Sequence, residues 1–324
     1  DGVQMAGANL SGGRDFTPSR VGVNSISRVE VTKVPLPSSA ADTMSGSINL
    51  VSKSAFERSK AELRYRIGIS SNEQTFALKK TPSPFNKKTY KIYPDLNFDY
   101  TLPISKNLGL VVTGLHSTSS FQTDTWYTDY RASATGVPTV TSENPYLQRL
   151  RNVQIFRAYE RKSLSLKLDW RPSKHSVLSF TGLVTKYHQD NSNDQFNPTV
   201  GTNGTSSIAN GGTTLQYTNT SVIGATGRGA MPQAFSYLES DSLNQAANIR
   251  YRFDDGTWRI TSSINASTST ATRRDVDEGF FNALGVAMRV PVRVSLLDVN
   301  NGRVGDFKIY DNNNNAIDPF DINN

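Results

Sequence analysis

The stretch AELRYRIGI, residues 61–69, decides the fold class. Its side chains alternate strictly between apolar and polar. The apolar set is Ala61, Leu63, Tyr65, Ile67 and Ile69, and the opposite set contains Glu62, Arg64 and Arg66. Because successive side chains of a β-strand point to opposite faces, this pattern predicts a strand with one apolar and one charged face.

The same alternation returns along the chain. Four further segments show it clearly: 95–102, 163–170, 247–253 and 258–265. Two more, 108–115 and 177–187, carry apolar residues on both faces and still have strand-like composition. We therefore predict seven strands.

The connections between these strands alternate in length. The short ones are 103–107, 171–176 and 254–257, which predict tight hairpins. The long ones are 70–94, 118–160 and 188–246, and they are rich in polar residues. An antiparallel sheet built this way has short turns at one end and long loops at the other.

Composition excludes several classes of protein. The mean hydropathy is −0.46, and the longest nearly unbroken apolar run, residues 108–115, is far shorter than the ~20 residues of a spanning helix. Cysteine is absent, which excludes disulfides and thiolate sites. We find no arrangement of catalytic residues and expect no enzyme, no cofactor and no metal site, since the three histidines lie far apart in sequence.

The net charge of +7 raises the question of nucleic-acid binding. The positive residues are scattered, and the densest group, 79–91, contains prolines and predicts a solvated loop. No nucleic-acid motif accompanies it. We therefore expect no nucleic-acid partner, and basic loops also suit a surface that faces anionic lipid headgroups.

Strands with one apolar and one charged face, joined by short turns at one end and long loops at the other, are typical of outer-membrane barrels. The apolar face would contact outer-membrane lipid, and charged residues would face the lumen, since lipid contact would cost several kcal/mol for each charge at mid-membrane. Single-chain bacterial barrels have an even number of strands, so we expect seven strands to be part of a longer protein. The fold class predicted for 57–324 is a partial transmembrane antiparallel β-barrel with long extracellular loops.

Residues 1–56 differ in character. They contain three short motifs in order: DGV at 1–3, ISRVEV at 26–31 and GSINLVSK at 46–53. In order and spacing these motifs resemble the end of the plug domain of TonB-dependent receptors of the Gram-negative outer membrane. Two departures are the KVP at 33–35, where the family usually has Arg-Gly-Pro, and DTMS at 42–45, where it commonly has Tyr-Gly. The resemblance implies a small, partial α/β plug domain in 1–56, with 28–31 and 48–51 as strands of one sheet.

The resemblance also implies a function and partners. A receptor of this family takes up a scarce nutrient such as an iron-siderophore, cobalamin or a saccharide. Its plug is coupled to the TonB–ExbB–ExbD complex through a segment expected upstream of Asp1. Ligand-contacting loops of the plug face outward, and the loop 8–21 holds the position of such a loop. Arg14, Asp15 and Phe16 are therefore the candidate ligand-binding residues.

Two other functions remain open from the residues. A passive porin or autotransporter barrel would share the strands but would have no plug ahead of them. A soluble β-rich carbohydrate-binding protein would have similar composition. Dependence on detergent would distinguish the soluble protein from the two membrane proteins.

Overall fold

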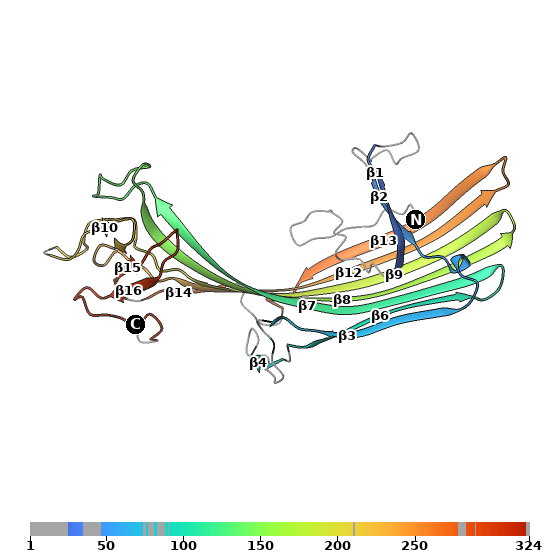
Figure 1. Cartoon of the computed structure of the whole chain (residues 1–324), viewed down its shortest axis with the longest axis horizontal. Helices are drawn as coiled ribbons and strands as arrows, with labels where there is room; N and C mark the ends of the chain where they lie inside the picture. Colours follow the sequence, from blue (N-terminus) through green and yellow to red (C-terminus); the bar gives the residue numbers. More distant parts are fainter. Residues whose placement is uncertain are drawn as a thin grey trace. The chain divides into compact units, whose positions relative to one another are not determined.

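The computed structural model describes residues 25–34, 47–73, 76, 81–82, 88–89, 91–209, 211–277, 283–288 and 290–321. The described part of the chain is mostly antiparallel β-sheet, with very little helix (Figure 1). A short 3-10 helix, η3 (Ala55–Glu57), follows the first two strands. The candidate loop residues Arg14, Asp15 and Phe16 lie outside the described residues.

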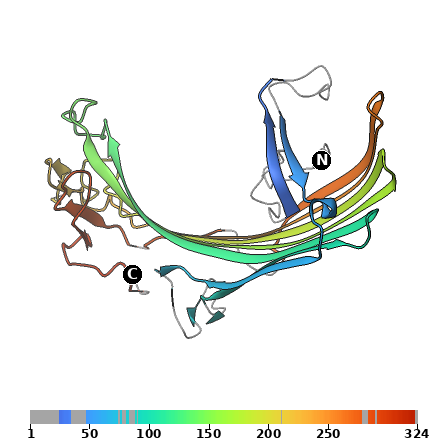
Figure 2. The same ribbon diagram turned by 45° about the vertical axis from the view of Figure 1, so that its right-hand side comes forward.

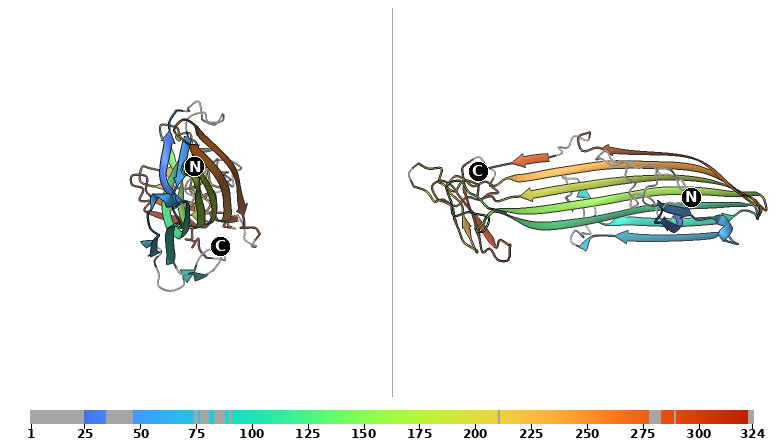
Figure 3. Two further views of the ribbon diagram at one scale, coloured as in Figure 1. Left: turned by 90° about the vertical axis from the view of Figure 1, so that its right-hand side faces the viewer. Right: turned by 90° about the horizontal axis from the view of Figure 1, so that it is seen from above.

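The principal sheet contains all seven predicted strands. Their order in the sheet is β13-β12-β9-β8-β7-β6-β3, so neighbours in this series are paired and β13 and β3 are its two ends. Figure 3 shows them running side by side. Their bounds are β3 (Glu62–Ser70), β6 (Tyr93–Pro103), β7 (Leu108–Arg131), β8 (Tyr146–Ser173), β9 (Ser176–Phe196), β12 (Gln233–Asp254) and β13 (Arg259–Arg273). A short strand, β14 (Ala283–Val286), also pairs with β12. Another two-stranded ladder joins β4 (Thr81–Pro82) and β5 (Lys88–Thr89).

The three short connections are confirmed, but two of the long ones were predicted too long. The segment 118–160 is mostly strand, because β7 continues to Arg131 and β8 begins at Tyr146. Likewise β9 runs to Phe196 and β12 begins at Gln233, which shortens the predicted loop 188–246. The added residues are largely polar: Thr and Ser are frequent in the extension of β7, and Asn, Asp, Gln and Ser in those of β9 and β12. A backbone ladder does not require apolar alternation, and Thr and Tyr favour strands, so a search for alternating apolar residues misses them.

The chain divides into two compact units. The first comprises Asp1–Phe121, Ala158–Asp190 and Glu239–Glu278, and the second comprises Gln122–Arg157, Asn191–Leu238 and Gly279–Asn324. The predicted boundary at residue 56 remains a prediction.

In the first unit, strand β3 has the two faces that its sequence predicts. Leu63, Tyr65 and Ile67 are 58%, 70% and 74% exposed. Glu62 and Arg64 lie on the opposite face, where they line a small cavity of about 220 Å³ together with Asp99 of β6. The apolar face is thus open in this structure, and the charged face is the one against which other residues pack.

A hairpin lies on that charged face (Figure 2). Its strands are β1 (Ile26–Thr32) and β2 (Ser47–Ser52), which pair antiparallel with Val29 opposite Leu50 and Val31 opposite Ile48. The hairpin is a separate two-stranded sheet and adds no strand to the principal one. The prediction that 28–31 and 48–51 are strands of one sheet is confirmed.

The second unit has a hydrophobic core that the sequence analysis did not predict. A four-stranded sheet has the order β10 (Gln216–Tyr217), β11 (Val222–Ile223), β15 (Arg293–Leu297) and β16 (Asp306–Tyr310). Buried apolar side chains of this core include Tyr146, Leu150, Val200, Val222, Met231, Val294, Leu296 and Ile309. Part of the supposed polar loops is therefore a folded unit.

Candidate functional site

The segment that follows the hairpin is fixed to the principal sheet. It forms η3, whose N-cap is Ser54. The Ser54 Oγ accepts a hydrogen bond from the Phe56 amide at 3.4 Å, as expected for a serine at a helix start. The same hydroxyl donates to Asp169 Oδ2 of β8 at 2.6 Å. A single serine thus ends the hairpin segment and attaches it to the sheet.

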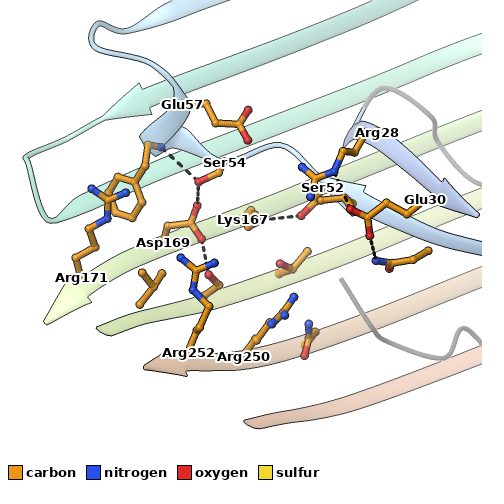
Figure 4. A pocket seen from close by; sticks show the side chains of 17 residues that line it. Arg28, Glu30, Ser52, Ser54, Glu57, Lys167, Asp169, Arg171, Arg250 and Arg252 are labelled. Carbon is orange, nitrogen blue, oxygen red and sulfur yellow. Dashed lines mark hydrogen bonds and ion pairs between the residues drawn. The ribbon is translucent and has the colours of Figure 1, made fainter. Parts of the chain in front are cut away.

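Asp169 is the centre of this attachment (Figure 4). It is only 2% exposed, and its second oxygen accepts a hydrogen bond from Ser179 Oγ of β9 at 2.6 Å. A buried carboxylate is tolerated only where hydrogen bonds replace its lost hydration. The two hydroxyls meet that requirement, so Asp169 couples the hairpin segment to β8 and β9.

Three further contacts hold the segment. Lys53 forms an ion pair with Asp99 of β6. Lys167 Nζ of β8 donates to Ser52 Oγ at 2.8 Å, and the Arg171 guanidinium lies 3.9 Å from the centroid of the Phe56 ring. The residues on the sheet side are charged, so the hairpin is docked mainly by polar contacts. We call the segment Ser52–Glu57 with these partners the anchor.

Glycine at position 109 allows the anchor to approach the sheet. A Cβ atom built on Gly109 of β7 would lie 2.5 Å from the Ala55 Cβ, closer than such atoms approach in proteins, and Ala55 is fully buried. Glycine is required wherever two backbones come this close.

Gly109→Ala is therefore expected to displace η3 and weaken the anchor by about 1–3 kcal/mol, the usual cost of overpacking. Trypsin cleavage after the neighbouring Arg58 should become roughly tenfold faster, because the open state is more populated. Gly182→Ala is the matched control, since its Cβ would meet nothing closer than Phe180 at 3.8 Å. Adding Ala55→Gly to Gly109→Ala should restore resistance; no rescue would mean that the contact with Ala55 is not the cause.

A cavity of about 450 Å³ lies beside the anchor, between the hairpin and strands β8, β9 and β12. Positive side chains outnumber carboxylates in its lining, as Figure 4 shows. The positive residues are Arg28, Lys167, Arg171, Arg250 and Arg252, and the carboxylates are Glu30, Glu57 and Asp169. The lining holds no histidine, and the arrangement suits binding of a polar or anionic molecule.

On the hairpin itself, both carboxylate oxygens of Glu30 accept hydrogen bonds. The donors are Arg28 Nε and Asn49 Nδ2, each at 2.8 Å. The Arg28 guanidinium, followed by the Asn49 amide, holds the pKa of Glu30 below its usual value. Glu30 is therefore ionised at neutral pH, and it neutralises Arg28 rather than the cations across the cavity.

A second charged cluster lies elsewhere in the first unit. His188 Nδ1 is 2.9 Å from Asp241 Oδ1, and its Nε2 is 3.5 Å from Asp190 Oδ1 and 4.0 Å from Glu239 Oε1. Of these carboxylates, Asp241 also faces two positive side chains, because Arg274 and Lys186 pair with it at 3.0 and 3.7 Å. His188, Asp190 and Glu239 offer ligand atoms that lie within 4.8 Å of one another. We interpret the cluster as a charge network.

The hydrogen bond to Asp190, opposed by partial burial and reinforced by Asp241, raises the pKa of His188 from 6.5 to about 9. Along β9, His188 follows Phe180 and Val184, whose apolar side chains are exposed. Because its pKa is higher in the folded state, protonated His188 stabilises the fold fully below pH 6.5, and this stabilisation disappears as pH rises through about 9.

His188→Gln should thus lower the free energy of unfolding by on the order of 3 kcal/mol at pH 6 and by almost nothing at pH 10. Urea denaturation at a series of pH values measures this difference. A deficit that is the same at both pH values would show that His188 acts through packing rather than charge.

The sequence analysis identified part of this site. The strand faces carrying Asp169, Arg250 and Arg252 were predicted to be the charged ones, but no residue of the anchor was singled out. Ser54 and Asp169 are 115 positions apart, and neither belongs to a motif. The predicted ligand residues Arg14, Asp15 and Phe16 lie outside the described residues, so their role stays a prediction.

Comparison with known proteins finds no matching family model, no similar curated protein and no similar solved structure. No helix in the described ranges has the length and apolar character needed to cross a membrane. The function therefore has to be argued from the geometry of the hairpin, the anchor and the cavity.

Proposed function

We propose that the chain is part of an outer-membrane receptor for TonB-dependent active uptake of a scarce nutrient. In this proposal the seven-stranded meander is part of the wall of a transmembrane barrel. The β1–β2 hairpin is part of the plug inside it. The three short turns lie at the periplasmic end, and the plug acts together with the TonB–ExbB–ExbD complex.

The observation that carries the proposal is the way the hairpin docks. It rests on the charged face of the meander through hydrogen bonds and ion pairs, among them Ser54 to Asp169 and Lys53 to Asp99. Polar contacts of this kind can be exchanged for water at modest net cost, whereas parting an apolar interface exposes apolar surface. Such docking suits an element that must leave the wall and return.

The opposite face of the meander supports a membrane location. Large apolar side chains are exposed along it, on at least six of the seven strands. They include Leu63, Tyr65, Ile67, Leu96, Leu164, Leu166, Phe180, Val184, Ile249 and Tyr251. A soluble protein rarely leaves a continuous apolar surface of this kind in water. Outer-membrane lipid would cover it without any protein partner.

Transport of this kind needs no covalent chemistry. A ligand binds from outside, for which Arg14, Asp15 and Phe16 remain the predicted contacts, and occupancy is relayed through the plug. Force applied to the plug then breaks contacts at the anchor. A passive porin does not account for a hairpin docked on the charged face, and a soluble carbohydrate-binding protein does not account for the exposed apolar face.

Planar-bilayer conductance of the full-length protein tests the proposal. The wild-type protein should insert from detergent and conduct very little, because the plug occupies the lumen. Deleting residues 26–52 should open a large, steady conductance, with heat-modifiable gel migration showing that the barrel still folds. A wild-type protein that already conducts freely would be a passive porin, and one that stays soluble without detergent would contradict a membrane role altogether.

A further inference from the structure

The cavity beside the anchor contains charge that the protein does not neutralise. Within the described residues, Arg250 and Arg252 have no carboxylate within ion-pair distance. Two of the three carboxylates that line the cavity are engaged elsewhere: Asp169 accepts from two serines, and Glu30 accepts from Arg28 and Asn49. Only Glu57 remains against Lys167, Arg171, Arg250 and Arg252, so the cavity has an excess of positive charge.

A buried amide lies next to these arginines. Asn248 is only 7% exposed, and its Oδ1 atom is buried without a hydrogen-bond partner among the described residues. Asn248 lines the same cavity. Buried polar side chains are nearly always hydrogen-bonded in folded proteins, so an unpartnered one in a cavity wall indicates a missing partner. A ligand hydroxyl could donate to this oxygen.

The strand register brings these groups together. Asn248, Arg250 and Arg252 are spaced by two along β12, so their side chains share one face. The adjacent strand β9 contributes Ser179 and Thr181 to the same cavity, and β8 contributes Lys167. One wall thus combines two guanidinium groups, an amide, hydroxyls and an ammonium group (Figure 4).

We propose that this cavity is a binding subsite for a small anionic solute that also bears hydroxyl groups, such as a sugar phosphate. Guanidinium groups bind phosphate and carboxylate oxygens through paired N–H donors, and an amide and hydroxyls recognise ligand hydroxyls. The volume of about 450 Å³ lies in the range of small-molecule sites. The inference rests on the proposed function, in which a solute passes the inner face of the wall, and it names the chemical class of that solute.

The experiment measures binding of glucose 6-phosphate and of glucose to the full-length protein in detergent by titration calorimetry. We expect glucose 6-phosphate to bind at least tenfold more tightly than glucose. The double variant Arg250→Gln with Arg252→Gln should lose at least tenfold in affinity for the phosphate, and Asn248→Ala should weaken it further. Arg259→Gln is the matched control, because Arg259 pairs with Asp254 at 2.9 Å and does not line the cavity. Heat-modifiable migration reports folding of each variant.

Equal affinity for the two probes, or full affinity in the double arginine variant, would overturn the inference. The two proposals fail separately. Selective binding of the phosphate together with a wild-type protein that conducts freely would keep the subsite and reject the plugged receptor. A closed wild-type channel that opens on hairpin deletion but shows no preference for the phosphate would keep the receptor and reject the subsite.

Discussion

Asp169→Ala is expected to release the β1–β2 hairpin, so that its backbone amides exchange with solvent about 100-fold faster than in the wild type. Asp169 is 2% exposed and accepts hydrogen bonds from Ser54 and Ser179. Hydrogen bonds to a charged group contribute about 1.5–3 kcal/mol each, and loss of both should cost at least about 3 kcal/mol. Since each 1.4 kcal/mol is a factor of ten in an equilibrium, the open state should become about 100 times more populated.

Hydrogen exchange followed by mass spectrometry measures this on peptides that contain Val29, Val31 and Leu50. Asp169→Asn keeps the size and one acceptor oxygen, so it should show a smaller effect than alanine. Asp277→Ala is the matched control, because Asp277 is exposed and lies outside the anchor. If exchange in the hairpin is unchanged in Asp169→Ala, then the ion pair of Lys53 with Asp99 and the packing of η3 are sufficient to hold the hairpin.

The residues that carried the sequence prediction explain why much of the fold could be foreseen. In β3 the alternation of Leu63, Arg64, Tyr65 and Arg66 is imposed by the geometry of a strand, and it needs no knowledge of the rest of the chain. That β1 and β2 share a sheet was also predicted, through the resemblance of two short motifs to a plug domain. Local patterns of this kind do not depend on how the rest of the chain folds.

Contacts across the sequence could not be foreseen. The Ser54 hydroxyl meets Asp169, 115 residues away, because of the register of the whole meander and the close approach at Gly109. Glycine occurs in strands for several different reasons. Only the structure shows that at position 109 the close neighbour that requires glycine is Ala55. The same holds for Asn248, whose lack of a partner becomes visible only once its surroundings are known.

The second unit was missed for a different reason. Its strands are short, and β10 and β11 have only two residues each, so no alternation can be read from them. Its core residues, such as Leu150, Val200 and Val294, are separated by long polar stretches. Around β15, however, Val292, Val294 and Leu296 alternate with Arg293 and Ser295, which is a strand signal that the sequence analysis missed. A segment rich in Asn, Ser, Thr and Gly was therefore predicted to be loop where the structure has a packed unit.

The core of this unit leads to the second large effect, which is expected for Leu296→Ala. Leu296 of β15 is fully buried. In the sheet it stands opposite Val222 of β11 on one side and Phe307 of β16 on the other. Removing a buried leucine side chain costs about 2–5 kcal/mol, partly from lost burial and partly from the cavity left behind. The second unit is small, so a loss of this size should leave much of it open at room temperature.

Pulse proteolysis in increasing urea measures the stability of the second unit through cleavage between residues 197 and 232. We expect Leu296→Ala to shift this cleavage to clearly lower urea while the seven-stranded meander keeps its heat-modifiable migration. Leu284→Ala is the matched control, since the same side chain is 53% exposed in β14 of the same unit. Equal behaviour of the two leucine variants would mean that residues 197–232 belong to the polar loop predicted at 188–246 and that residues 290–321 have no packed core. A large effect of Leu296→Ala alone would show that these segments fold around a core. Any ligand-binding surface that they form would then be an ordered surface and not a mobile loop.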